Sequence, residues 1–173
     1  MLYELLKSRR SIRKFQDREV EKDKMDILLK SALLAPSSRS RRPWEFIAVT
    51  DKELLKKLSK AREHSSSFIE NAPLGIVVVA DPEKCDVWIE DASIASIIIQ
   101  LTAQSLGLGS CWIQIRERFH SGNLKAEDYV KEVLGIPSNY NVECMIAVGY
   151  PAEAKSAYSE DDLMYEKLHY NKY

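Results

Sequence analysis

Two short segments rich in arginine and serine are candidate ligand contacts. The first is RRSIRK, residues 9–14, and the second is PSSRSRRPW, residues 36–44. Guanidinium groups, hydroxyls and backbone N–H groups are the donors that bind a phosphate monoester or an anionic ring. Alternation along an extended segment predicts that Arg9, Ser11 and Arg13 converge on one ligand. Taken alone, each segment also fits a simpler interpretation, a solvated basic edge for the first and a surface loop for the second.

A third candidate is the glycine-containing segment GLGSCWIQI, residues 107–115. Its glycines permit close approach of the backbone to a flat ligand. It is not a dinucleotide fingerprint, because Trp112 stands where GxGxxG requires its last glycine. The alternative is a simple turn from a helix into a strand.

Other chemistries have little support in the sequence. We predict no metal site, because no HExxH or other ligand spacing occurs around the isolated histidines His64, His120 and His169. There is no GxSxG motif and no P-loop. We expect four acidic residues to serve as helix caps or surface charges, namely Asp81, Asp86, Glu90 and Asp91. The three cysteines lack a CxxC pair and are expected to be free thiols of a reducing compartment: Cys85, Cys111 and Cys144.

Charge and hydropathy restrict the class of protein further. The chain has 173 residues and a net charge of −1, which argues against a nucleic-acid partner. Residues 1–42, however, contain 12 Lys and Arg but only 6 Asp and Glu, so an anion could be held there. The longest apolar stretch, residues 94–106, is interrupted by Ser, Gln and Thr, so we expect no membrane association. No signal peptide is recognisable, and a cytoplasmic location is expected.

Hydrophobic periodicity predicts an α+β fold in which residues 1–173 form one domain. Helices are expected at 2–8, 20–34, 52–62, 87–106 and 124–134, and strands at 45–50, 74–80, 110–115 and 142–148. The stretch 74–80, LGIVVVA, is typical of a strand buried on both faces. From Ala152 onward the tail is polar with scattered tyrosines, and it could wrap a partner subunit.

The helix expected at residues 87–106 is apolar on almost every side. Ile94, Ile97, Ile98 and Leu101 form one stripe, and a second stripe consists mostly of small residues, Ala92, Ser96, Ile99 and Ala103. A helix without a polar face is expected to be buried on all sides. It is either a core helix of one subunit or a core helix that also lies in a dimer interface.

The order and spacing of these segments resemble the nitroreductase family of FMN flavoproteins along essentially the whole chain. The resemblance rests on RRSIRKF, APSSRSRRPWEFIAV, NAPLGIVVVAD, the helix followed by GLGSCWI, and VGYPAEAK. It implies a central, mostly antiparallel sheet flanked by helices. It also implies an intertwined homodimer with a long central helix and an extended C-terminal tail.

The resemblance implies FMN-binding residues position by position. The first segment would hold the phosphate, ribityl chain and pyrimidine edge through Arg9, Arg10, Ser11 and Arg13. The serine-rich loop would reach the flavin held mainly by the other subunit, through Pro36, Ser37, Ser38 and Ser40. The strand after GLG would run beside the ring at Trp112, Ile113 and Gln114. No catalytic side chain is assigned, because the flavin itself carries the electrons.

Three departures from the family pattern stand out. Ser40 replaces a common asparagine and Arg42 a common glutamine. The region that often supplies a basic phosphate contact is acidic here, with Glu160, Asp161 and Asp162. Lys155 is the candidate substitute, with Arg41 or Arg42 as alternatives.

The implied function is NADH- or NADPH-driven reduction of a nitroaromatic, quinone or similar small acceptor. Alternatives are a flavin-dependent oxidase, dehydrogenase or dehalogenase-like enzyme of the same fold, or a non-catalytic FMN-binding protein. The sequence carries no signal that selects NADH over NADPH.

Overall fold

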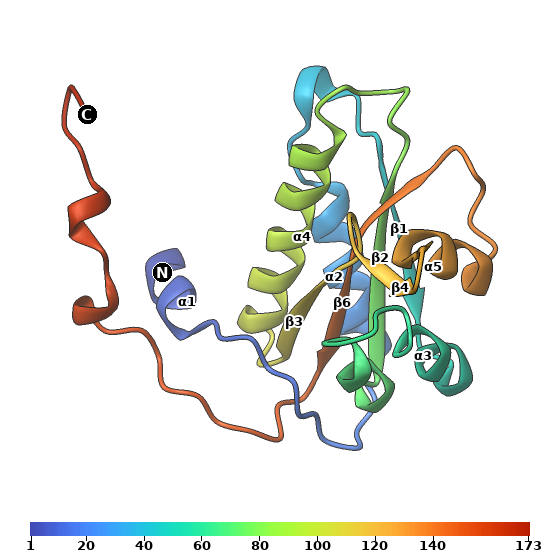
Figure 1. Ribbon diagram of the computed structural model, residues 1–173. Coiled ribbons are helices and arrows are strands. Elements are labelled where there is room, and N and C mark those ends of the chain that lie inside the picture. Colours follow the sequence, from blue (N-terminus) through green and yellow to red (C-terminus); the bar gives the residue numbers. More distant parts are fainter.

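A four-stranded antiparallel sheet forms the centre of the protein, whose structure, a computed structural model, describes residues 1–173 (Figure 1). The strands are β1 (Trp44–Val49), β2 (Leu74–Ala80), β3 (Gly109–Gln114) and β6 (Asn141–Gly149), in the spatial order β1-β2-β6-β3. Every residue of β2 is buried, as its continuous β-branched sequence predicts for a central strand. The predicted α+β class with an antiparallel sheet is confirmed.

Helices cover both faces of the sheet. On one face lie α2 (Lys22–Leu33) and α4 (Trp88–Ser105), and on the other lie α3 (Lys52–Leu58) and α5 (Ala126–Leu134) (Figure 1). Each face has its own hydrophobic core because side chains alternate along the strands. The α4 side buries Leu28, Ile76, Ile99 and Ile146, whereas the α3 side buries Leu58, Val77, Ile113 and Met145.

The two stripes of α4 have different surroundings. The mostly small stripe, Ala92, Ser96, Ile99 and Ala103, is buried inside the subunit. Small side chains there allow the helix to approach the sheet and α2 closely. The apolar stripe faces outward, with Ile94 39% and Ile97 38% exposed. The subunit therefore leaves a row of isoleucines on α4 in contact with water.

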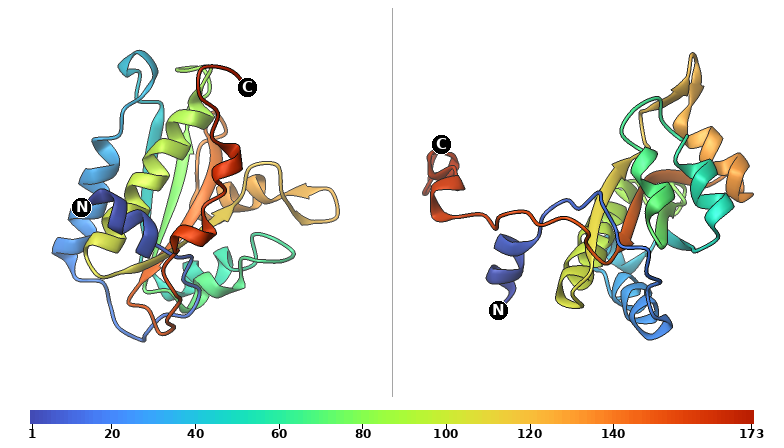
Figure 2. Two further views of the ribbon diagram at one scale, coloured as in Figure 1. Left: turned by 90° about the vertical axis from the view of Figure 1, so that its left-hand side faces the viewer. Right: turned by 90° about the horizontal axis from the view of Figure 1, so that it is seen from below.

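The two ends of the chain form an arm that stands away from the body (Figure 2). The arm consists of α1 (Leu2–Ser8) and residues 152–173, which include the short 3₁₀ helices η3 (Glu160–Asp162) and η4 (Tyr165–Lys167). The Tyr158 N–H donates to the Lys7 carbonyl at 2.9 Å, and the Tyr3 hydroxyl donates to Glu160 at 2.9 Å. No residue of α1 or of residues 152–173 is buried.

The structure differs from the sequence prediction in its short elements. Residues 124–125 are not the start of a helix but β5 (Leu124–Lys125), which pairs with β4 (Phe119–Ser121) in a hairpin that was not predicted. Gly122 turns this hairpin with φ at +54°. Two 3₁₀ helices were also missed, η1 (Ser38–Ser40) and η2 (Ser67–Asn71), and α3 ends four residues before the expected Arg62. None of the helices combines the length and apolar character needed to cross a bilayer.

Candidate functional site

The RRSIRK segment lies extended along the free edge of β3. Ser11 forms a parallel bridge with Ser110, and the Ile12 N–H donates to the Ser110 carbonyl at 3.0 Å. Ile12 is buried, and Phe15 forms an antiparallel bridge with Pro151. These two apolar anchors fix the segment in an alternating conformation.

The alternation brings Arg9, Ser11 and Arg13 to the side of β3 from which Cys111 projects. Burial raises the pKa of the Cys111 thiol, and this rise is opposed by the charge of Arg13, by the nearby Ser11, and by the charges of Lys155 and Arg9. Four of the predicted site residues therefore lie near the same part of β3, where Ser11 pairs with Ser110 and Lys155 contacts the Ser11 carbonyl. Neither Arg9 nor Arg13 has an acidic partner within 4.0 Å.

Arg10 points elsewhere. Its guanidinium donates to the Ser156 carbonyl and lies over the Tyr158 ring, 4.5 Å from the centroid. The structure thus places Arg10 against the C-terminal arm and not with Arg9 and Arg13.

Glu153 is a residue of this site that the sequence analysis missed. Its carboxylate accepts the backbone N–H of Arg13 at 2.6 Å and that of Lys14 at 3.2 Å. These N–H donors, Arg13 first, and the charge of Lys155 hold the pKa of Glu153 below its usual range. Lys155 in turn donates to the Ser11 carbonyl at 2.5 Å. The PAEAK segment therefore clamps the arginine segment, and its position directly after the VGYP turn was the only signal in the sequence.

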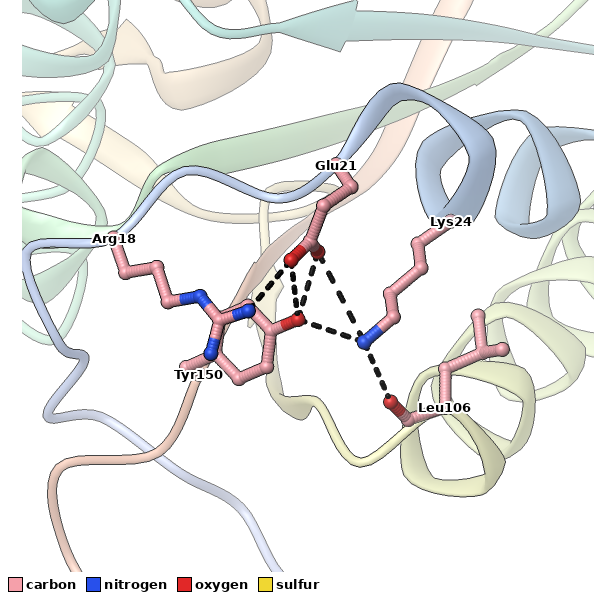
Figure 3. A network of polar contacts seen from close by, with 5 residues as sticks. All are labelled: Arg18, Glu21, Lys24, Leu106 and Tyr150. Carbon is pink, nitrogen blue, oxygen red and sulfur yellow. Dashed lines mark hydrogen bonds and ion pairs between the residues drawn. The ribbon is translucent and has the colours of Figure 1, made fainter.

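The segment beyond Phe15 is held by a polar network around Tyr150 (Figure 3). Glu21 accepts the Tyr150 hydroxyl at 2.7 Å and the Arg18 guanidinium at 2.6 Å. Lys24 donates to the Tyr150 hydroxyl at 2.7 Å and to the Leu106 carbonyl at 3.3 Å. The hydrogen bond from Tyr150, followed by the other donors, lowers the pKa of Glu21 to about 2. The network ties the start of α2 to the end of β6 and the end of α4.

Strand β3 supplies the third group of predicted residues. Gly109 allows Ile12 to approach, since a Cβ at Gly109 would lie 2.8 Å from Ile12 Cβ. The Trp112 indole donates to the Gln114 side chain at 2.9 Å, and Gln114 donates to the Arg116 carbonyl at 3.1 Å. Ile113 points into the core on the α3 side. Trp112 and Gln114 are therefore fixed in orientation by each other.

The serine-rich loop is rigid and strained. Arg39, Ser40 and Arg42 have φ of +52°, +54° and +47°, values that side chains other than glycine rarely adopt. The Arg42 N–H donates to Ser37 Oγ at 2.9 Å, and the Ser38 N–H donates to Asp91 at 2.9 Å. Pro36, ahead of these contacts, is exposed.

Asp91 anchors this loop to the first turns of α4. Its side chain was expected to be a cap or a surface charge, but the residue is only 3% exposed. It accepts the Ser38 N–H and also the Cys85 thiol, at 3.4 Å. A buried carboxylate is retained where hydrogen bonds compensate its desolvation, and here they fix the loop. Trp44, at the end of the loop, is buried against Ala35 and Ala95.

The two arginine-and-serine segments lie at opposite ends of α4 (Figure 1). The loop is attached at Asp91, whereas the other segment begins directly after Ser8, whose Oγ accepts a hydrogen bond from Gln104 at 3.3 Å. The thirteen residue steps from Asp91 to Gln104 correspond to about 20 Å of helix at 1.5 Å per step. One subunit therefore cannot bring Ser38 and Ser11 to the same small ligand.

Two hollows of the single subunit agree with this separation. One of about 820 Å³ is lined by residues 15–20, 50, 52, 55 and 70–73, apart from the cluster around Cys111. A second, of about 310 Å³, is bordered by Arg10, Ile12, Lys155 and residues 107–109. Neither is lined by residues of both segments.

Comparisons with known proteins define the family. The model of the nitroreductase family matches residues 6–63 and 59–150, and the chain belongs to this family. A solved structure described as an FMN-dependent nitroreductase from Clostridium difficile R20291 is 57% identical, with a TM-score of 0.97 over 98% of each chain.

Two curated relatives extend the comparison. A protein of Archaeoglobus fulgidus, named as a candidate NADH dehydrogenase or NAD(P)H nitroreductase, is 40% identical over 162 residues, 91% of this chain and 90% of its own. An iodotyrosine deiodinase of Thermotoga neapolitana is 25% identical over 179 residues, 95% of this chain and 96% of its own.

Proposed function

We propose that this protein is an FMN-dependent oxidoreductase that uses NADH or NADPH to reduce a nitroaromatic, a quinone or a similar small acceptor. Each chain folds as one domain, and two chains form a homodimer with two flavin sites. The names of the relatives support the cofactor and the donor, since they include an FMN-dependent nitroreductase and an NAD(P)H nitroreductase.

The observation that carries the proposal is the position of the two segments at opposite ends of α4. If two copies of α4 pack antiparallel about a two-fold axis, the first turns of one helix lie beside the last turns of the other. Ser38 of one subunit then approaches Ser11 of the second, twice per dimer. A site that is divided in the subunit becomes complete in the dimer.

The exposed apolar surface supports the same assembly. Ile94 and Ile97 on α4 face outward, and the arm exposes Leu6, Tyr165 and Leu168 by 45%, 57% and 57%. Exposed large apolar side chains on one helix face and on a projecting arm are typical of a protein interface. We propose that the helices pair along the isoleucine row and that each arm lies on the other subunit.

The residues around Cys111 fit the phosphate and the pyrimidine edge of FMN, with Arg9 and Lys155 toward the phosphate and Arg13 toward the ring. Arg9 and Arg13 present guanidinium groups without acidic partners, and Ser11 and Lys155 lie beside them. The dianionic phosphate pairs well with such donors. Arg10 would act from the side of the arm. When bound, the flavin would supply the hydride chemistry by alternating between its oxidised and reduced forms.

The chain's other residues would position and tune the ring. Trp112, Ile113 and Gln114 offer the backbone edge of β3 beside it. The loop of the second subunit, Pro36, Ser37, Ser38 and Ser40, would close the other side and exclude water. Arg13 would stabilise negative charge on the reduced ring, which raises the reduction potential.

The test combines cofactor, assembly and turnover. Purified protein should show the two visible bands of oxidised flavin, elute as a dimer, and oxidise NADH or NADPH in the presence of a nitroaromatic or quinone. Ile97→Glu should yield monomers that lose FMN, whereas Phe119→Glu, an equally polar change on the distant β4, should leave both intact. A colourless protein that ignores added FMN would refute the proposal.

The acceptor panel separates the alternatives. A halotyrosine belongs in it because a deiodinase is among the relatives. Bound FMN that neither NADH nor NADPH reduces would indicate a non-catalytic flavin protein. Rapid oxidation of NADH or NADPH with oxygen as the only electron acceptor would indicate an oxidase.

A further inference from the structure

Three arginines of the serine-rich loop have no anionic partner in the subunit. Arg39, Arg41 and Arg42 are all exposed. No carboxylate lies within 4.0 Å of any of them. The only hydrogen bond of their side chains is that from Arg41 to the Lys84 carbonyl, at 3.1 Å. Lys84 itself adds a fourth positive charge, partly offset by Asp81 at 4.0 Å.

The backbone of this loop does not favour arginine. Arg39 and Arg42 occupy the left-handed region, where each non-glycine residue costs on the order of 1 kcal/mol or more. Glycine or asparagine would relieve that cost. The strain persists because Asp91 and Ser37 hold the loop from both sides. Apart from the Arg41 hydrogen bond to Lys84, the positive side chains are therefore displayed from a strained loop that they do not help to stabilise.

The flavin does not require these charges. The phosphate of a mononucleotide carries about −1.5 to −2, and Arg9 and Lys155 near Cys111 already supply two positive charges to match it, beside Arg13 at the ring. In the proposed dimer, the loop lies across the flavin from that cluster, at the mouth through which the reactants enter. A second anion would meet the loop arginines there.

We propose that Arg39, Arg41 and Arg42 recognise an anionic group on a reactant of the flavin site, either the 2′-phosphate of NADPH or a carboxylate of the electron acceptor. Both sources present oxygen anions that guanidinium groups bind through paired hydrogen bonds. The inference rests on the proposed function for the position of the loop, and it defines the class of substrate.

Equilibrium binding to the FMN-loaded protein tests the proposal without turnover. The probes are two matched pairs, NADP⁺ against NAD⁺, and 4-nitrobenzoate against 4-nitrobenzamide. We expect the wild type to prefer the anionic member of at least one pair about tenfold, a preference that falls as salt is added. The pair that shows the preference identifies the source of the anion.

The variants assign the preference to the loop. In the triple variant Arg39→Gln, Arg41→Gln, Arg42→Gln, the ratio of the two dissociation constants should fall to near one, and lysine at all three positions should restore part of it. The control is Lys52→Gln, Lys56→Gln, Lys57→Gln on α3, which removes the same charge and should keep the ratio.

Three results would overturn the inference. They are a wild type that binds both members of each pair equally, a glutamine variant that keeps the preference, and a glutamine variant that loses FMN, which would assign the arginines to the cofactor. Failure of the proposed function has a different signature, because it appears as a colourless protein that ignores added FMN or as bound FMN that neither NADH nor NADPH reduces, whereas failure of this inference appears as equal binding by a flavin-loaded, active protein.

Discussion

Replacing Gly109 by alanine tests how the arginine segment is positioned. A Cβ at this position would lie 2.8 Å from Ile12 Cβ and Cγ1 and 2.9 Å from Cγ2. Carbon atoms in contact prefer about 3.5–4.0 Å, so residues 11–13 must move by about 1 Å. The Ile12 N–H to Ser110 hydrogen bond, now 3.0 Å, would lengthen, and Ser11 and Arg13 would move with it.

Two magnitudes follow from this displacement. Overpacking of a close contact costs about 1–3 kcal/mol, which lowers Tm by about 2–12 °C in a chain of this size. Loss of one charge-assisted hydrogen bond to the phosphate costs about 1.5–3 kcal/mol, so FMN should bind about 10- to 100-fold more weakly. Thermal unfolding of the apoprotein measures the fall in Tm, and flavin fluorescence titration measures the loss of FMN affinity.

Gly75→Ala is the matched control. Its Cβ would lie 2.9 Å from Leu55 Cδ2 and 3.3 Å from Ile69 Cδ1, in the core on the α3 side. It should lower Tm and leave the FMN dissociation constant unchanged. If Gly109→Ala also binds FMN like the wild type, the contact between Ile12 and Gly109 does not position Ser11 and Arg13 for FMN binding.

Three further predictions concern single groups. Arg13→Ala should weaken FMN binding and lower the flavin reduction potential; wild-type values for both would exclude Arg13 from the ring edge. Glu153→Ala should weaken FMN binding more than Glu153→Gln, which keeps an acceptor for the Arg13 N–H. Because the pKa of Glu153 is lowered in the fold, the contribution of its carboxylate to holding the arginine segment is complete above the usual glutamate pKa. That contribution is lost as pH falls through the lowered pKa. The wild type should therefore lose FMN affinity in acid more than Glu153→Gln does. Because Cys85, Cys111 and Cys144 are buried, their thiols should not react with an aromatic disulfide reagent in the native protein, and all three should react after unfolding. One fast-reacting thiol in the native protein would contradict that burial.

The sequence predicted the long elements because burial dictates their composition. The run of β2 follows from burial on both faces and the small stripe of α4 from burial against the sheet and α2, and the bounds of both elements agree with the prediction within two residues. The β4–β5 hairpin was missed because strands of three and two residues are too short to show a period.

Within the candidate site, the sequence predicted donors better than acceptors. Arg9, Ser11 and Arg13 share a face because the segment is extended, which alternation alone anticipates. Asp91 was interpreted as a cap or surface charge and Glu153 was not singled out, because their roles depend on contacts 53 and 140 residues away along the chain. The left-handed conformations of Arg39 and Arg42 were also invisible, since they are imposed by those contacts and not by the residues' own preferences.

A site divided between the ends of α4 links flavin binding to assembly. If FMN binds only where two subunits meet, two bound ligands favour the dimer by the factor (1 + [FMN]/Kd) squared, about 10⁴ at a free concentration of 100 Kd. The dimer dissociation constant, measured by sedimentation at increasing FMN, should therefore fall with a limiting slope of two on logarithmic axes. A site contained within one subunit would leave that constant independent of FMN. A slope of zero with bound flavin would mean that Ser11 and Ser38 do not share a ligand.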